Sequence, residues 1–354
     1  MPIHDLGYRG WKGKLSPYAM RWWVIATNGI KIAWRSFWLR RMLLLAWAPA
    51  LTMGLGFFLY EQYRDVFEDP QTAMLLDGFG RAVSILPNAD SVVDGMQEAR
   101  RLPLLERQAA LADLRHDVWA LLLLTFFRYP QGVLMVLIVG LIAPPLISSD
   151  LRTRAFLFYF SRPITHGEYI LGKAAVVWCY LMMITMVPSL VLYVFGVLLS
   201  PDLSVVYDTW DLPIRIIIAS AILLIPTTAL ALMFSSLTSE SRFAGYAWFS
   251  VWALGWVAYL ILTVATTNID RPMRSGRFAV ESHSIDIQEI VEEQPIVEGW
   301  TEVSLIHMLW KVEGYVFGLE EDVSDVLPSA VILLLLTFFA IYVLQRRVSA
   351  PTRV

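Results

Sequence analysis

The chain has 354 residues, of which 57% are hydrophobic and 17% are charged, and its mean hydropathy is +0.56. These values exclude an ordinary water-soluble globular domain, in which about half of the residues are apolar and about a quarter charged. The single cysteine, Cys179, excludes a disulfide framework or a cysteine-based metal site within one chain. The net charge of −3 indicates no particular partner, because positive and negative charges are segregated along the chain.

The N-terminal segment 1–41 is basic and aromatic. About forty polar and amphipathic residues precede the first apolar run, so we expect no cleavable signal peptide. Apolar and aromatic residues recur here at helical spacing beside lysine and arginine, which predicts an amphipathic helix lying in the lipid headgroup region. The alternative is an N-terminal extension of the first membrane helix. The residues assigned to the interfacial helix are Trp22, Trp23, Lys31, Trp34, Arg35 and Trp38.

Six apolar runs meet or approach the roughly 20 residues that a helix needs to cross a hydrocarbon core of about 30 Å. Their internal prolines do not exclude them, because neighbouring helices satisfy the freed carbonyl groups. The sequence therefore predicts an all-α polytopic membrane protein with six transmembrane helices and two sizeable extracytoplasmic loops of mixed α and β structure. The predicted spans are 42–60, 130–147, 174–199, 212–234, 243–267 and 326–344.

Lysine and arginine orient membrane proteins, because they accumulate on the cytoplasmic side. The segments on one side of the predicted bundle carry 16 basic residues. On the other side, 61–117, 200–211 and 268–325 carry 10 basic and 27 acidic residues. We therefore expect a multi-pass protein of a bacterial cytoplasmic (inner) membrane with both termini in the cytoplasm. The predicted cytoplasmic segments are 1–41, 148–173, 235–242 and 345–354, and the predicted external segments are 61–129, 200–211 and 268–325.

The two long external segments differ from flexible linkers, because they are neither rich in glycine and serine nor repetitive. In the first, Pro103 suits the first turn of a helix that runs on to residue 127 with its apolar positions mostly on one face. We expect that helix either to dip into the outer leaflet or to continue into the second span through a break. The second segment combines a β-prone run, 277–293, with a predicted helix over 304–317.

Searches for a reactive site yield little. Gly167, Gly172 and Lys173 satisfy a nucleotide-binding G-x-x-x-x-G-K pattern, but Ala174 stands where Ser or Thr would hold Mg²⁺ and a membrane helix follows. No ionisable residue lies in the middle of a predicted span, which argues against intramembrane catalysis and proton-coupled transport. We expect no catalytic, cofactor or metal site and no enzyme activity in this chain. Hydroxyl groups within the spans either line a path or, more commonly, bond to a neighbouring helix or to their own: Thr185, Ser189, Thr227 and Thr228.

The segment between the second and third spans carries a longer pattern. Asp150 is followed by the apolar run 156–160, by Ser161-Arg162-Pro163 and by Gly172-Lys173. This pattern resembles the first cytoplasmic loop of type-2 ATP-binding-cassette (ABC) exporter permeases, which shows an acid, Gly-Thr, an apolar run, Ser-Arg-Pro and a distal Gly-Lys. The chain departs from it twice, because Asp replaces the usual Glu and Arg154-Ala155 stand in place of Gly-Thr.

The resemblance implies a permease subunit of an ABC transporter of the exporting type, which forms a homodimer or a heterodimer with a related permease. A separate cytosolic ATPase would hold ATP and Mg²⁺ and supply the energy. In that family the loop forms a coupling helix that docks into a groove of the ATPase, after an amphipathic elbow helix and within a six-span plan. The coupling residues so implied are Asp150, Arg152, Arg154, Phe156, Phe158, Tyr159, Phe160, Ser161, Arg162, Pro163 and Lys173.

The aromatic residues of this loop suit anchors in a groove, and its arginines suit contacts with acidic groups at the rim. The alternative is a loop helix packed under its own bundle or on the headgroups. A second, weaker contact with the ATPase is expected in 235–242, at Glu240 and Arg242.

A function of another class also fits the topology, namely a non-transporting membrane anchor or assembly factor whose external loops bind a periplasmic or surface partner. Capture of an ATPase that depends on Phe158 and Arg162 would favour the permease, whereas loop-dependent capture of an external protein without an ATPase would favour the anchor. Both functions involve membrane lipids, and neither involves nucleic acid.

Overall fold

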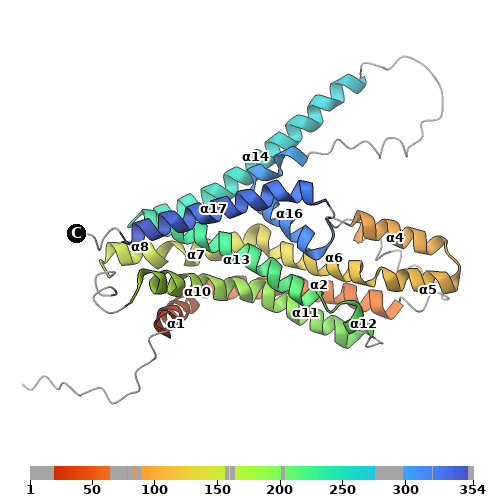
Figure 1. The fold of residues 1–354 in the computed structure, drawn as a ribbon, viewed down its shortest axis with the longest axis horizontal. Helices are drawn as coiled ribbons and strands as arrows, with labels where there is room; N and C mark the ends of the chain where they lie inside the picture. The colour runs from red at the N-terminus through yellow and green to blue at the C-terminus, as the bar shows by residue number, and fades with distance from the viewer. Residues whose placement is uncertain are drawn as a thin grey trace, which may run out of the picture.

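The computed structural model describes residues 20–63, 78, 83–84, 86, 89–155, 159, 164–200, 204–275, 298–320 and 322–349. Within these ranges the chain is helical and contains no strand, and the helices form an elongated bundle (Figure 1). Six helical stretches in the described part are long and apolar enough to cross a membrane, which confirms the predicted all-α, six-span fold. They are Phe37–Glu61, Ala109–Arg152, His166–Leu199, Leu212–Leu237, Ser241–Val264 and Val323–Ser349.

The first two helices are separate elements. Helix α1 (Arg21–Trp34) ends before Arg35 and Ser36, and α2 (Phe37–Tyr63) then begins the first span. Figure 1 shows α1 nearly end-on at one end of the bundle, where the spans run across the picture. The N-terminal helix is therefore an element across the bundle and not an extension of α2. Trp38 was assigned to the interfacial helix, but it lies in the first turn of α2.

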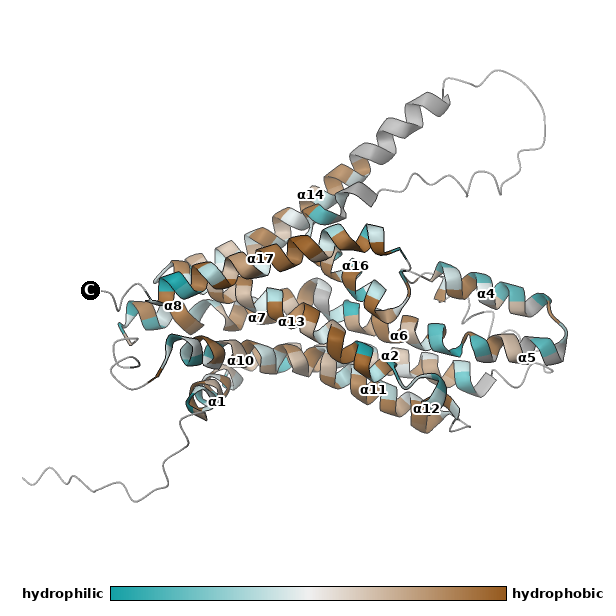
Figure 2. Cartoon of the chain, in the orientation of Figure 1, coloured by the Kyte–Doolittle hydropathy of each residue, from teal (hydrophilic) through white to brown (hydrophobic). Residues whose placement is uncertain are grey.

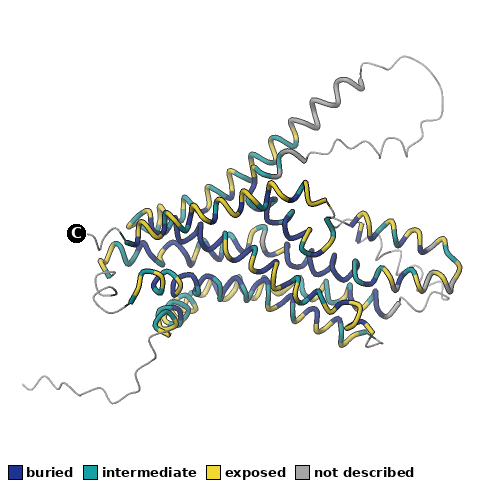
Figure 3. The backbone as a smooth tube through the Cα atoms, in the orientation of Figure 1, coloured by how far each residue is buried: buried dark blue, intermediate teal, exposed yellow. Residues whose placement is uncertain are grey.

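The second span continues a helix from the external segment. Helices α4 (Asp90–Arg101) and α5 (Leu104–Asp113) precede α6 (Arg115–Pro130), which passes through the π-helical turn η2 (Gln131–Met135) into α7 (Val136–Ile142) and α8 (Pro144–Arg152). The structure thus shows continuation into the span through a break, and the break follows Pro130. Figure 3 shows that α6 is buried along most of its length, because other helices surround it.

The third span consists of α10 (His166–Ile184) and α11 (Met186–Leu199), which meet at Thr185. The hydroxyl groups of Thr185 and Ser189 donate to the carbonyl oxygens of Leu181 and Thr185 at 2.9 and 2.7 Å. These two hydroxyls therefore bond to their own helices. A short helix, α12 (Ser204–Asp208), leads to α13 (Leu212–Leu237), the most buried of the six spans.

The last elements cover one side of α13. Helix α14 (Ser241–Ser275) angles away from the bundle, and η3 (Glu298–Val303), α16 (Leu305–Phe317) and α17 (Val323–Ser349) follow it (Figure 1). Helix α16 covers almost all of the helix predicted over 304–317, and it ends at Gly318, whose φ of 81° is the left-handed conformation that glycine adopts without strain. The β-prone run 277–293 lies outside the described residues.

Hydropathy varies along the bundle. Figure 2 shows hydrophobic residues over the lengths of α7, α13 and α17, and hydrophilic residues gathered towards the ends of the bundle and on α4 and α5. This is the pattern expected of helices that cross a hydrocarbon core between two aqueous phases.

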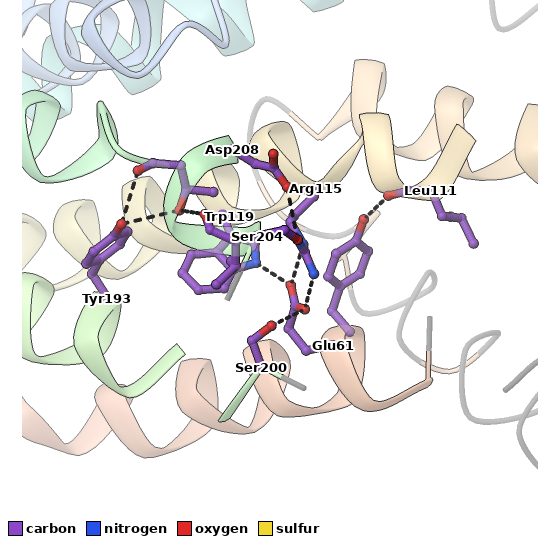
Figure 4. Close-up of polar contacts among 11 residues, drawn as sticks. Glu61, Leu111, Arg115, Trp119, Tyr193, Ser200, Ser204 and Asp208 are labelled. Carbon is purple, nitrogen blue, oxygen red and sulfur yellow. Dashed lines mark hydrogen bonds and ion pairs between the residues drawn. The ribbon is translucent and has the colours of Figure 1, made fainter. Parts of the chain in front are cut away.

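At the end of the bundle that carries α12, a buried ion pair joins three segments (Figure 4). Glu61, at the end of the first span, accepts from Arg115 Nη2 at 2.8 Å and Nε at 3.1 Å, from Trp119 Nε1 at 2.9 Å and from Ser200 Oγ at 3.0 Å. The side chains of Glu61 and Arg115 are 0% and 1% exposed, respectively. Arg115 also donates to Asp208 at 3.0 Å, so its charge is compensated from two sides.

Candidate coupling site

The predicted coupling segment lies at the opposite end of the bundle, which we call the α1 end. Helix α1, the end of α8, the start of α10 and the C-terminal end of α17 all lie at this end, where α10 packs against α1 and α17 (Figure 1). Described basic residues gather at this end, whereas the end with α12 carries acidic side chains. The basic residues are Arg21, Lys31, Arg35, Arg40, Arg41, Arg152, Arg154, Lys173, Arg242, Arg346 and Arg347.

Helix α8 ends in a Schellman motif, in which amide groups beyond the helix close back on its last carbonyl oxygens. Ala155 N donates to Asp150 O at 2.9 Å, and Arg154 N donates to Leu151 O at 3.3 Å. The residue at the turn, Arg154, has a φ of 54°, in the left-handed region that favours glycine. Arg154 stands where the resembling family has glycine, so the chain keeps the turn and accepts the strain of a side chain there.

Replacing Arg154 with glycine should therefore stabilise the protein. Relief of a left-handed conformation at a non-glycine residue is worth about 1 kcal/mol, so we expect Arg154→Gly to raise the thermal unfolding midpoint in detergent. The matched control is Arg152→Gly, because Arg152 lies in the last turn of α8 and glycine inside a helix costs about 0.5–1 kcal/mol. Equal shifts for the two variants would contradict the assignment.

Helix α10 begins with a capping box. Thr165 Oγ1 accepts from Glu168 N at 3.2 Å, and Glu168 Oε2 accepts from Thr165 N at 2.7 Å. The residues from Gly167 to Lys173 lie inside this helix and form no phosphate-binding loop. The coupling segment is therefore bounded by two well-terminated helix ends.

Those helix ends are joined by a network that we call the clamp, made of Asp150, Tyr169 and Lys173. Lys173 Nζ lies 2.7 Å from Asp150 Oδ2, and the Tyr169 hydroxyl donates to the same oxygen at 2.7 Å. The side chains of Lys173 and Asp150 are only 11% and 14% exposed. Because Asp150 belongs to α8 and the other two to α10, the clamp fixes the distance between the ends of the coupling segment.

Tyr159 is the one residue described between Ala155 and Ile164. Its ring lies 5.5 Å from that of Tyr169, and Lys173 Nζ lies 5.9 Å from its centroid. Burial, and then the negative charge of Asp150, raise the pKa of Tyr159, so its phenol is neutral at ordinary pH. Tyr159 thus packs on the chain's own bundle, as the alternative interpretation of this loop has it.

The two predicted cytoplasmic contacts lie near each other. Arg152 Nη1 is 4.0 Å from Glu240 Oε2, and both side chains are largely exposed, so this pair contributes little stability. Arg242 is exposed on the first turn of α14. The end of α8 and the turn between α13 and α14 therefore form one continuous surface at the α1 end.

Helix α1 packs closely on α10. A Cβ atom at Gly172 would lie 2.8 Å from the carbonyl oxygen of Trp22, so only glycine permits this approach. Trp34 stacks on Tyr180, whose hydroxyl donates to Ile30 O at 2.7 Å. Trp23, Lys31, Trp34 and Arg35 are exposed, as a helix in the headgroup region requires, whereas Trp22 is half-buried.

Part of the predicted site lies outside the described residues: Phe156, Phe158, Phe160, Ser161, Arg162 and Pro163. The structure brings Asp150, Tyr159 and Lys173 together. Sequence analysis missed Tyr169, which stands four residues before Lys173 and so on the same face of the helix. That spacing was the signal that would have identified it.

The order of these features along the chain agrees with a known family. The chain matches the family described as "ABC-2 family transporter protein" over residues 24–290. This range is 267 of the 354 residues and includes most of α1, the clamp and five of the six spans. The chain belongs to this family. Comparisons with curated proteins and with solved structures gave no match.

Membership makes the chain a membrane subunit of an ABC transporter, and it confirms the family inferred from the coupling segment. ABC-2 permeases are transport components that associate with an ABC ATPase, and they are not themselves the catalysts. The clamp and the packing of α1 therefore belong to a multi-pass ABC-2 permease.

Proposed function

We propose that this ABC-2 permease is driven by a separate cytosolic ATPase that docks on residues 150–163, and that it exports its substrate. The observation that carries the proposal is the clamp. It links the end of α8 to the start of α10, so a displacement of the coupling segment by the ATPase would move the second and third spans together. Export is the direction implied by the resemblance of 150–173 to exporter permeases.

The proposal places the α1 end in the cytoplasm of a bacterial inner membrane. Basic residues gather at this end, and the positive-inside rule assigns such ends to the cytoplasm. Helix α1 and the end of α17 both lie there (Figure 1), which supports cytoplasmic positions for both termini. A cytosolic ATPase then meets the coupling segment and the Arg152–Glu240 surface from the same side.

We further propose that two permeases pair through α14. This span has the lowest buried share of the six, 11% within its apolar window, against 22% for the first span and 28% for the last. Its exposed side chains are large and apolar over several turns, which suits close packing between helices. They include Phe243, Tyr246, Leu254, Leu260 and Ile261.

Co-expression with the ATPase encoded nearest to this chain tests the proposal. We expect wild type to retain the ATPase through purification, and the mass of the complex to equal two permeases and two ATPases. In the double variant Phe158→Asp, Arg162→Glu, the amount of ATPase that co-purifies should fall about tenfold. The first change puts a charge into the apolar groove of the ATPase, and the second reverses the charge of a contact at the rim of that groove. The control is Tyr207→Asp, at the opposite end of the bundle and 86% exposed. Equal retention by all three would overturn the docking site.

A further inference from the structure

A cavity of about 300 Å³ lies at the α1 end, between α1, the start of α2, α7, α8 and α10. Helix α1 contributes one stripe to its wall, at positions three and four residues apart. That stripe consists of Ile25, Asn28, Gly29, Ile32 and Ala33, and Ser36, between α1 and α2, also lines the wall. The facing wall includes Leu141, Ser149 and the clamp residues Asp150 and Lys173.

The interior of this cavity carries one fixed negative and one fixed positive charge with unused hydrogen-bonding capacity. Asp150 uses Oδ2 for both Lys173 and Tyr169, and its Oδ1 makes no hydrogen bond within the described residues. The Lys173 ammonium has three N–H donors and makes one ion pair in the same part of the chain. Asn28 adds an exposed amide on the α1 side. A ligand with both an ammonium and an anionic group matches these partners.

The mouth of the cavity is apolar and lies beside the membrane-facing helices. Ile32 and Leu141 are 58% and 41% exposed, and both line the cavity. Lys31 and Arg35 are exposed on flanking positions of α1, where they attract phosphate groups of the lipid surface. The volume of about 300 Å³ is at the small end for a ligand pocket, and it suits a lipid headgroup whose acyl chains stay outside along the apolar mouth.

We propose that this cavity binds the headgroup of a phosphoethanolamine lipid from the cytoplasmic leaflet. The primary ammonium donates to Asp150 Oδ1, and the phosphate accepts from Lys173 and Asn28. A choline headgroup fits less well, because its methylated nitrogen has no N–H donor for Asp150. A purely anionic headgroup fits less well, because it brings a negative charge to Asp150 without a compensating ammonium.

Native mass spectrometry of the delipidated permease in detergent tests the proposal with three lipids of identical acyl chains. We expect phosphatidylethanolamine to bind about tenfold more tightly than phosphatidylcholine, which is the size of one lost charge-assisted hydrogen bond. Binding should weaken similarly in Asn28→Leu, which removes the amide, and in Ala33→Phe, which fills the cavity. Val24→Phe adds similar bulk on α1 away from the cavity and should bind as wild type.

Equal affinity for phosphatidylethanolamine and phosphatidylcholine would overturn the proposal, as would tighter binding of phosphatidylglycerol. Unchanged binding in both Asn28→Leu and Ala33→Phe would overturn it as well, and Asn28→Leu serves this purpose even if Ala33→Phe fails to fold. The assay contains no ATPase, so its failure is distinct from a failure of the docking proposal.

Discussion

Glu61→Ala is expected to destabilise the permease by about 3–5 kcal/mol, the cost of removing one partner from a buried ion pair. The variant leaves the Arg115 guanidinium buried and removes the acceptor to which Arg115, Trp119 and Ser200 donate (Figure 4). Because these groups hold α2, α6 and the segment after α11 together, their loss should loosen the α12 end as a unit. Thermal unfolding of the purified protein, followed by tryptophan fluorescence, measures the effect.

Two further variants separate the buried charge from general damage. Asp208→Asn removes the charge of the second partner of Arg115. Because the Asp208 side chain is 40% exposed, this variant should cost less than about 1 kcal/mol of stability. Glu61→Leu combined with Arg115→Met replaces the pair with apolar groups and should be more stable than Glu61→Ala, because no buried guanidinium is left with the partly exposed Asp208 as its remaining counter-charge. If the double variant were as unstable as Glu61→Ala, the buried charge would not be the cause.

Breaking the clamp should slow ATP hydrolysis while the ATPase stays bound to the permease. In Asp150→Asn the Lys173 ammonium loses its counter-charge. Because the Lys173 side chain is only 11% exposed, this loss should cost about 1–3 kcal/mol of stability. The ends of the coupling segment then separate more easily. We expect the hydrolysis rate per bound ATPase to fall about tenfold in reconstituted complexes, and Lys173→Met to behave alike.

The double variant Asp150→Asn, Lys173→Met should recover part of the lost rate, because it leaves neither charge uncompensated. The coupling energy between the two positions would then be about 1–3 kcal/mol. The matched control is Asp211→Asn with Arg215→Met, an ion pair at 2.6 Å near the start of α13 at the opposite end of the bundle, for which we expect a hydrolysis rate close to that of wild type. Additive losses at Asp150 and Lys173 would show that the clamp does not act as a unit.

The six spans were predictable because lipid imposes a simple requirement: every backbone polar group must be satisfied within a long apolar helix. The length of the second span was less predictable. Val118 to Phe127 is too short to cross alone, and only the structure shows that α6 passes through η2 into the membrane-spanning stretch. The separate direction of α1 depends on close packing at Gly172, which is a tertiary contact that local periodicity does not encode.

The candidate site was only partly predictable. Asp150 and Lys173 were identified through a family pattern, but their pairing spans 23 residues of sequence and follows from the way α8 and α10 pack. The sequence places Glu61 among the acids of an external loop, just after the predicted end of the first span. Its ion pair was not predictable, because its partner Arg115 lies 54 residues further along the chain. Arg154 departs from the family pattern, and its φ of 54° explains why the pattern has glycine there, since glycine adopts this left-handed conformation without strain.

Site-directed cross-linking to the ATPase tests the central claim most directly. Cys179 is the only cysteine, so Cys179→Ser gives a background in which a single cysteine at Phe158 or at Tyr207 carries the cross-linker. In membranes that contain both subunits, Phe158→Cys should cross-link to the ATPase and Tyr207→Cys should not. A cross-link from Tyr207→Cys, or none from Phe158→Cys while the ATPase co-purifies, would contradict docking of the ATPase on the coupling segment.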